Sequence, residues 1–175
     1  MKINRKQRGF SLIELLIVVA IILIIAAMAV PQLLKARISA DETSAVASIR
    51  NINQAEIQYS TSYPNVGFAP NLAALGGAAP CTPSQANACL LDNSVATASP
   101  GNGSKSGYMF LASPQGVVNG INTQYVVGAA PTSFNTTGVR NFCSTEVNVI
   151  RFTTGASGTQ PVNSIAACLN FSVMQ

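Results

Sequence analysis

The distribution of apolar and polar residues divides this chain of 175 residues into segments of different character. After a short basic stretch, the twenty residues from Leu15 to Leu34 carry no charge. In a helix with a rise of about 1.5 Å per residue, they measure about 30 Å, the thickness of the hydrocarbon core of a bilayer. The pattern therefore predicts a helix long and apolar enough to span a membrane.

The next segment, 35–63, keeps a helical pattern but is amphipathic. It holds no glycine or proline before Pro64, and its apolar residues recur near helical spacing at Ala45, Ile49, Ile52, Tyr59 and Tyr63. We expect it to continue the same helix, giving a rod of about 50 residues and about 75 Å. Because an isolated helix gains most of its stability from packing, its apolar face should contact the rest of the chain.

The remainder of the chain predicts a loop followed by a sheet. Residues 64–106 contain five prolines and the pair Gly76-Gly77, which indicates a long connecting loop with a short helical piece at Asn71–Leu75. In 107–175, turn residues separate four runs of β-type sequence: Tyr108–Ala112, Gln124–Ala130, Val147–Thr153 and Leu169–Val173. An antiparallel meander packed on one long helix is an α+β fold. Core positions are expected for the aromatic residues Tyr108, Phe110, Tyr125, Phe142, Phe152 and Phe171.

The net charge of +4 arises entirely at the amino terminus, from Lys2, Arg5, Lys6 and Arg8. Residues 10–175 hold six basic and six acidic residues. Positive charge before an apolar helix keeps that end in the cytoplasm, so the part after the helix is expected across the membrane. The charge therefore gives no argument for nucleic-acid binding.

The composition argues against most catalytic and metal sites. The chain has no histidine, which excludes Ser-His-Asp and Cys-His arrangements and histidine-ligated metals. Past Glu56 the only acids are Asp92 and Glu146, so a calcium site is not favoured and no cofactor is expected. The stretch Gly101–Ser106 lacks the Gly-Lys adjacency of a phosphate-binding loop.

Three interpretations of the amino-terminal segment compete. A secretory signal could be cleaved at Ala27-Met28-Ala29, and a plain signal anchor would explain the length and the basic stretch. Neither explains Glu14 within Gly9-Phe10-Ser11-Leu12-Ile13-Glu14. This sequence resembles the Gly-Phe-(Thr/Ser)-Leu-(Ile/Val)-Glu signature of the type IV pilin and pseudopilin family. The resemblance extends at motif level from Gly9 to about Pro31.

The resemblance implies processing and a filament role for the amino-terminal segment. A membrane peptidase would remove the leader 1–9 by cleaving between Gly9 and Phe10, and would methylate the new amino terminus of Phe10. Segment 10–34 would lie in the membrane and later in the filament core. Glu14 would meet the positive amino terminus of a neighbouring subunit, because an unpaired carboxylate in hydrocarbon is unfavourable. Pro31 would bend the helix.

The four cysteines all follow the apolar segment, in the part expected to be exported. An even number in an oxidising compartment favours disulfides over a metal site, and three pairings are possible. We favour Cys81 with Cys89, which closes a small loop, and Cys143 with Cys168, which ties down the carboxy-terminal end. The second pair resembles the bridged carboxy-terminal loop of many type IV pilins.

The sequence thus favours a structural subunit of a type IV pilus. The resemblance implies a homopolymer, processed by the prepilin peptidase and assembled by inner-membrane machinery. The subunit would be held by membrane lipid in the bacterial inner membrane before it enters an extracellular filament. The alternative within the family is a pseudopilin of a type II secretion system, many of which lack the carboxy-terminal bridge. An exported, membrane-anchored enzyme is the alternative from a different class.

Overall fold

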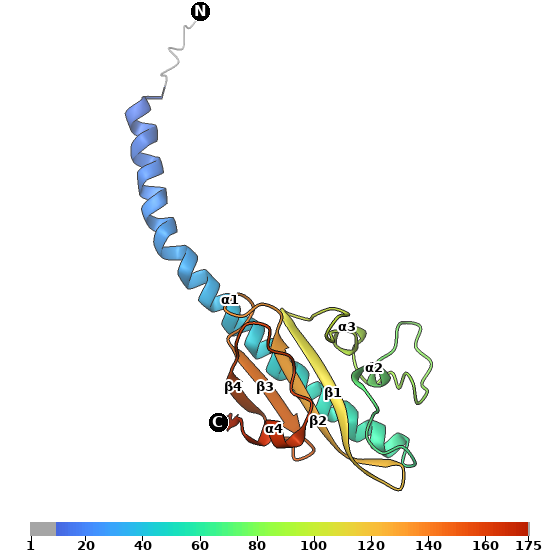
Figure 1. Ribbon diagram of the computed structural model, residues 1–175. Helices are drawn as coiled ribbons and strands as arrows, with labels where there is room; N and C mark the ends of the chain where they lie inside the picture. The colour runs from blue at the N-terminus through green and yellow to red at the C-terminus, as the bar shows by residue number, and fades with distance from the viewer. Residues whose placement is uncertain (1–9, 175) are drawn as a thin grey trace, which may run out of the picture. The chain divides into compact units, whose positions relative to one another are not determined.

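The computed structural model describes residues 10–174 and divides into two units, Met1–Ala36 and Arg37–Gln175. Helix α1, Leu12–Ser62, contributes residues to both units (Figure 1). In the second unit, α1 packs against an antiparallel sheet of five strands. The predicted α+β fold, a long helix on a small antiparallel sheet, is confirmed.

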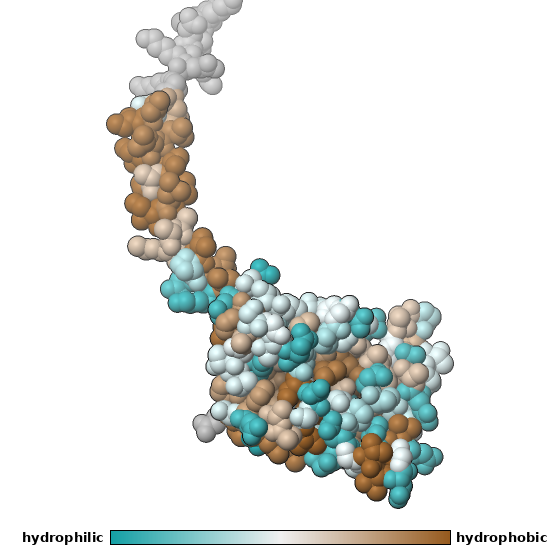
Figure 2. Space-filling view, in the orientation of Figure 1, coloured by the Kyte–Doolittle hydropathy of each residue, from teal (hydrophilic) through white to brown (hydrophobic). Residues whose placement is uncertain are grey.

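The first unit consists of the apolar part of α1. Its large apolar side chains are exposed, from 44% at Leu34 to 79% at Leu12, and they form a continuous apolar surface (Figure 2). Among the described residues, α1 is the one helix long and apolar enough to cross a membrane. Pro31 lies inside α1, and the bend expected there stays a prediction.

The second unit contains the sheet and three short helices. The strands lie in sequence order, each antiparallel to the next: β1 Tyr108–Val118, β2 Ile121–Pro131, β3 Arg140–Thr145, β4 Arg151–Thr154 and β5 Ser172–Val173. The helices are α2 Leu72–Leu75, α3 Asn93–Ala96 and α4 Ile165–Leu169. Figure 1 shows α2 and α3 beside β1, at the opposite edge of the sheet from β4.

One face of the sheet packs on α1 to form the main core. The helix contributes a buried apolar stripe that includes Ala45, Ile49, Ile52 and Tyr59, as its helical spacing predicts. Burial alternates along β1, where Tyr108, Phe110 and Ala112 are buried and the residues between them are half-exposed. Tyr125 and Phe142 complete the aromatic part of this core.

The other face of the sheet is covered by the carboxy-terminal segment. Val126, Cys143 and Cys168 form a second, smaller core there. The chain crosses so close to β2 that a Cβ atom at Gly128 would lie 2.3 Å from the Val162 carbonyl oxygen. Only glycine fits this approach. Residues Tyr125–Pro131 of β2 are buried because both faces of the strand are covered.

The structure corrects several expected elements. Strand β3 was not expected, since its sequence RNFCST has no run of β-branched residues. Val147–Thr153 is not one strand, because Asn148 takes a positive φ of 58° in a turn and β4 begins only at Arg151. Leu169–Val173 is also divided: Leu169 ends α4, whose amino terminus is capped by Ser164, and only Ser172–Val173 pair with β4.

Of two further expectations, one is confirmed and one is only partly met. The short helix predicted at Asn71–Leu75 is present as α2, with the Asn71 side chain capping it by accepting a hydrogen bond from Ala74 N. Tyr108, Phe110, Tyr125 and Phe142 are buried, whereas Phe152 and Phe171 are only half-buried. These two phenylalanines lie near the β4 edge of the sheet, where fewer elements cover them.

Candidate assembly site

The motif residues lie at the start of α1. Gly9 lies outside the described residues, and Phe10 is 83% exposed just before the helix. Ser11 immediately precedes α1, and its carbonyl accepts the Leu15 amide at 3.3 Å.

Glu14 accepts a hydrogen bond at the amino terminus of α1 within its own chain. Its Oε2 accepts a hydrogen bond from the Ser11 amide at 3.0 Å. A glutamate in the third helical position that satisfies the amide of the capping residue is half of a capping box, and its charge is favourable near a helix amino terminus. A carboxylate offers about four acceptor positions, so this bond leaves Glu14 able to accept from an ammonium group as well.

In the second unit, an ion pair between the buried Glu42 and the partly exposed Arg140 joins α1 to the sheet. Glu42 Oε1 accepts from the amides of Val139 at 2.9 Å and Arg140 at 3.1 Å. Its Oε2 accepts from Arg140 Nε at 2.8 Å and Nη2 at 2.6 Å. The Arg140 guanidinium also lies 5.4 Å from the ring centre of Phe142 and 5.5 Å from that of Phe152. These contacts fix α1 to β3.

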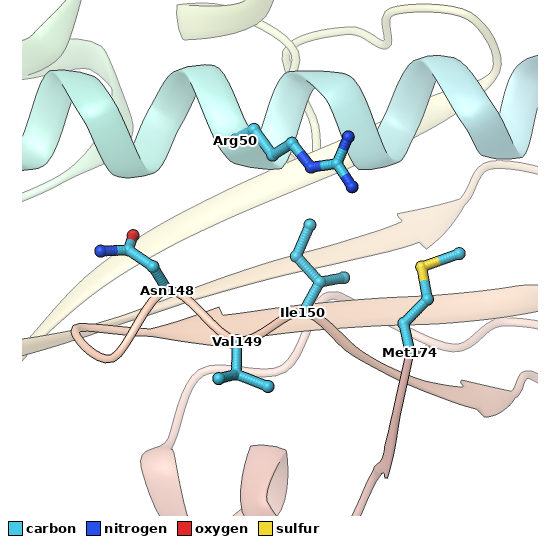
Figure 3. A pocket seen from close by; sticks show the side chains of 5 residues that line it. All are labelled: Arg50, Asn148, Val149, Ile150 and Met174. Carbon is cyan, nitrogen blue, oxygen red and sulfur yellow. The ribbon is translucent and has the colours of Figure 1, made fainter.

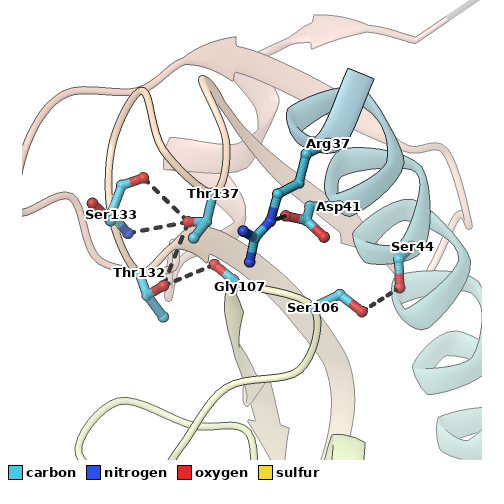
Figure 4. Close-up of polar contacts among 8 residues, drawn as sticks. All are labelled: Arg37, Asp41, Ser44, Ser106, Gly107, Thr132, Ser133 and Thr137. Carbon is cyan, nitrogen blue, oxygen red and sulfur yellow. Dashed lines mark hydrogen bonds and ion pairs between the residues drawn. The ribbon is translucent and has the colours of Figure 1, made fainter. Parts of the chain in front are cut away.

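Weaker polar contacts lie on α1 and on the turns that precede β1 and β3 (Figure 4). Ser44 donates to Ser106 at 2.9 Å, which connects α1 to the turn before β1. Arg37 and Asp41 lie 3.9 Å apart on α1, with Arg37 72% exposed, so their pair contributes about 0–1 kcal/mol. Thr132 donates through both N and Oγ1 to the Gly107 carbonyl.

A polar network crosses the helix–sheet interface one turn beyond Arg50. Asn53 Nδ2 donates to Ser144 Oγ at 2.9 Å, and Tyr125 Oη donates to Asn53 Oδ1 at 3.3 Å. Burial raises the pKa of Tyr125, so its hydroxyl remains a donor at neutral pH. These directional contacts occupy polar groups that would otherwise be unsatisfied in the core.

Glu56 is a fully buried carboxyl group at the far end of the same helix face. Its Oε2 accepts from the Ala69 amide at 2.8 Å, whereas its Oε1 has no partner among the described residues. Burial raises its pKa to about 8 from the ordinary 4.5, and the Ala69 hydrogen bond opposes this only in part. Glu56 is therefore largely protonated at neutral pH.

The raised pKa of Glu56 makes the stability of the second unit depend on pH. Below about pH 4.5 the group is protonated in both the folded and the unfolded chain. Between about 4.5 and about 8 the unfolded chain releases this proton and the folded chain retains it, so rising pH lowers stability by about 1.4 kcal/mol per unit. Above about 8 this loss is complete.

The structure joins Cys81 to Cys89 and Cys143 to Cys168, the same pairs favoured above, with Cα–Cα distances of 6.0 and 5.8 Å. The first closes a loop in the segment between α2 and α3. The second fastens α4 to β3 in the smaller core. Each therefore restrains a segment that has little regular structure of its own.

The described residues contain no group of three metal-ligating side chains. Asp92 accepts from the Ser94 hydroxyl and from the Ser94 amide, the second contact capping α3, and these hydrogen bonds lower its pKa. Glu146 accepts from Gln124 on β2 at 3.1 Å. The two late acids thus have separate local partners.

Comparison with known proteins identifies the amino-terminal motif. The model of the prokaryotic N-terminal methylation motif matches residues 4–30. The chain is 42% identical over 71 residues to the type IV wide pilus major component PilA4 of Thermus thermophilus, covering 41% of this chain and 53% of that protein. It is 37% identical over 76 residues to the type IV major pilin protein PilA of Myxococcus xanthus, covering 39% and 34%. These matches support the type IV pilin family.

The similarity is concentrated in part of the molecule. The matches span about a third and about half of the length of the two type IV pilins. The motif match includes Gly9, Phe10 and Glu14, but Pro31 and all four cysteines lie outside it. No solved structure matches the chain significantly. The motif and the apolar helix fit a membrane-anchored pilin.

Two acidic groups that hold the second unit together were not found from the sequence. Glu42 and Glu56 lie in the amphipathic part of α1, where an acid is ordinarily solvated. Their spacing from the apolar residues gave a usable signal: Glu42 is three residues before Ala45, and Glu56 is four after Ile52 and three before Tyr59. Both acids therefore share the helix face of the buried stripe.

Proposed function

We propose that this chain is a structural subunit of a type IV pilus, which polymerises through its amino-terminal helix into an extracellular filament. The observation that carries the proposal is the motif Gly9–Glu14 followed directly by an apolar helix whose side chains are exposed. Such a surface requires a cover of lipid or of other apolar helices, because burying one large apolar side chain is worth about 1.5–3 kcal/mol.

The proposed life cycle uses the same helix twice. Before assembly, 10–34 anchors the subunit in the bacterial inner membrane with the head outside the cytoplasm. The prepilin peptidase cleaves between Gly9 and Phe10 and methylates Phe10, and the inner-membrane assembly machinery then transfers the subunit to the filament. In the filament, lipid around the helix is replaced by the helices of other subunits.

Glu14 is proposed to guide docking in this step. The ammonium group of Phe10 in the incoming or neighbouring subunit would pair with its carboxylate, which removes the unfavourable free energy of an unpaired charge among apolar helices. The hydrogen bond from Ser11 uses one acceptor position and leaves others for this pairing.

The first test is the intact mass and amino-terminal sequence of the protein from the cells that make it, without reduction. We expect a chain of 166 residues that begins with N-methylated Phe10 and is lighter by about four hydrogens because of its two disulfides. A chain beginning at Val30 would instead indicate a secreted protein, and an uncleaved Met1 a plain membrane anchor. Sheared surface filaments distinguish a pilus from a secretion pseudopilus.

The second test separates the two roles available to Glu14. Glu14→Gln keeps an oxygen that can accept from the Ser11 amide but removes the charge. We expect both Glu14→Gln and Glu14→Ala to insert into the membrane and to lose filament assembly. Normal filaments from Glu14→Gln, with none from Glu14→Ala, would show that helix capping rather than charge pairing is needed.

A further inference from the structure

A groove with an unpaired cation runs along the side of the head formed by α1 and the β3–β4 connection. Three adjoining hollows of about 390, 300 and 250 Å³ share Arg50 in their walls. Figure 3 shows the Arg50 side chain extending from α1 above Ile150, with Asn148 and Met174 to either side. Met174 is held there because its amide donates to the Ile150 carbonyl at 2.9 Å.

The Arg50 guanidinium has no partner within the described part of the chain. No carboxylate lies within 4.0 Å of it, and it donates no hydrogen bond there, whereas Arg37 and Arg140 both have acidic partners. Besides the cation, the groove offers side-chain amides from Asn53, Gln54 and Asn148. A cation with neighbouring amides suits a carboxylate flanked by polar side chains.

The head has one matching acidic group on its surface. Asp41 and Glu42 are paired with arginines, Glu56 is buried, and Glu146 accepts from Gln124. Asp92 is exposed, accepts from the amide and hydroxyl of Ser94 through Oδ1 alone, and has no cation within 4.0 Å of it in the described structure. The next two residues, Asn93 and Ser94, are exposed as well, so this corner presents a carboxylate flanked by polar side chains.

The groove and the acidic corner lie toward opposite edges of the sheet, near β5 and β1 respectively. Asp92 caps α3, which lies with α2 beside β1 (Figure 1). The groove is lined by the β3–β4 connection and by Met174, which follows β5 at the other end of the strand order. Two complementary patches on opposite sides of one molecule form a heterologous contact, which propagates into a ring or a helical filament rather than a closed two-fold dimer.

We propose that the Arg50 groove binds the Asp92 corner of a neighbouring copy of this chain. The inference rests on the proposed pilus function and assigns the lateral contact between heads, in addition to the contacts between apolar helices. The Arg50 guanidinium would pair with the Asp92 carboxylate, and the groove amides would contact Asn93 and Ser94. Because both charges are exposed in the single copy, the contact forms without breaking an internal ion pair.

The test compares sheared filaments from single and double charge variants. We expect Arg50→Glu and Asp92→Arg each to reduce filament yield about tenfold or more, because a like charge then faces its former partner. Asp92→Asn should also reduce the yield, because it loses the charge but keeps the side-chain oxygen that caps α3. The double variant Arg50→Glu/Asp92→Arg should restore filaments. Arg37→Gln, compared with Arg50→Gln, is the matched control, since both arginines lie exposed on α1 and only Arg50 lines the groove.

Cross-linking identifies the occupant directly. A photo-crosslinking residue at Gln54, an exposed groove position, should join a peptide containing Asp92 of another copy in assembled filaments. Cross-links to a different protein, normal filaments from both single charge variants, or no rescue in the double variant would each overturn the proposal. The test requires that the unchanged chain forms filaments and that the amino terminus is processed in every variant. If the unchanged chain forms no filaments or is not processed, the pilus proposal itself fails, which is distinguishable from failure of the Arg50–Asp92 contact.

Discussion

Replacing Glu42 by alanine is expected to destabilise the head by about 3–5 kcal/mol, because the buried carboxylate accepts from two amides and from the partly exposed Arg140. The substitution leaves the amides of Val139 and Arg140 without their acceptor. It also leaves the Arg140 guanidinium without its carboxylate. Each hydrogen bond to a charged group contributes about 1.5–3 kcal/mol, so loss of the two amide contacts alone accounts for most of the effect.

A second substitution separates the amide contacts from the charge. Glu42→Gln retains an oxygen for the two amides and loses the charge opposite Arg140. The Arg140 side chain is 36% exposed, so solvent screens this part of the interaction, and we expect a loss of about 1–2 kcal/mol. Alanine should therefore destabilise the head at least about twice as much as glutamine.

The measurement is urea unfolding of the full chain in a non-ionic detergent with the disulfides oxidised. Near-ultraviolet circular dichroism reports on the buried tyrosines Tyr108 and Tyr125. With a slope near 2 kcal/mol per molar urea, the midpoint for Glu42→Ala should fall by about 1.5–2.5 M. Asp41→Ala is the control, since its pair with Arg37 is exposed. Equal midpoints for Glu42→Ala and Asp41→Ala would refute the reasoning.

Two further substitutions test the other features of the head. Glu56→Gln should remove most of the loss of stability between about pH 5 and about pH 8, seen as a smaller shift of the urea midpoint; an unchanged shift would mean that Glu56 does not titrate in this range. Replacing both Cys143 and Cys168 by serine should lower stability by about 3.5 kcal/mol, against about 2.5 for the Cys81–Cys89 pair, because it opens a longer loop. The reverse order in thermal unfolding would contradict this account.

The sequence predicted those elements whose periodicity is strong. The apolar run and the stripe from Ala45 to Tyr59 indicated a helix because their spacing persists over many turns. The core of the β1–β2 pair was also predicted, since β1 alternates and β2 is almost entirely apolar from Tyr125 to Pro131. The strands are longer than expected because residues 113–118 of β1 and 121–123 of β2 also form part of the pair, outside the expected runs.

Strand β3 could not be predicted from local sequence, because its environment is created by distant segments. Asn141, Ser144 and Thr145 are polar residues that the fold buries. Ser144 can be buried because it accepts from Asn53, which lies 91 positions earlier in the chain. The features of the candidate site likewise divide into local ones, which the sequence predicted, and long-range ones, which it did not. The motif Gly9–Glu14 is local and was recognised, whereas the ion pair of Glu42 with Arg140 joins residues 98 positions apart. Tertiary contacts determine both features.

Glu42 and Glu56 have a common role despite their different environments. They are 14 residues apart, which is close to four helical turns, so they lie near the two ends of the apolar stripe on one face of α1. Apolar contacts along this stripe are non-directional and tolerate a shift of the helix along the sheet. Glu42 accepts from β3 at one end, and Glu56 accepts from Ala69 at the other. Directional hydrogen bonds near both ends thus fix the position of this part of α1 against the sheet, as the proposed pilus subunit would require.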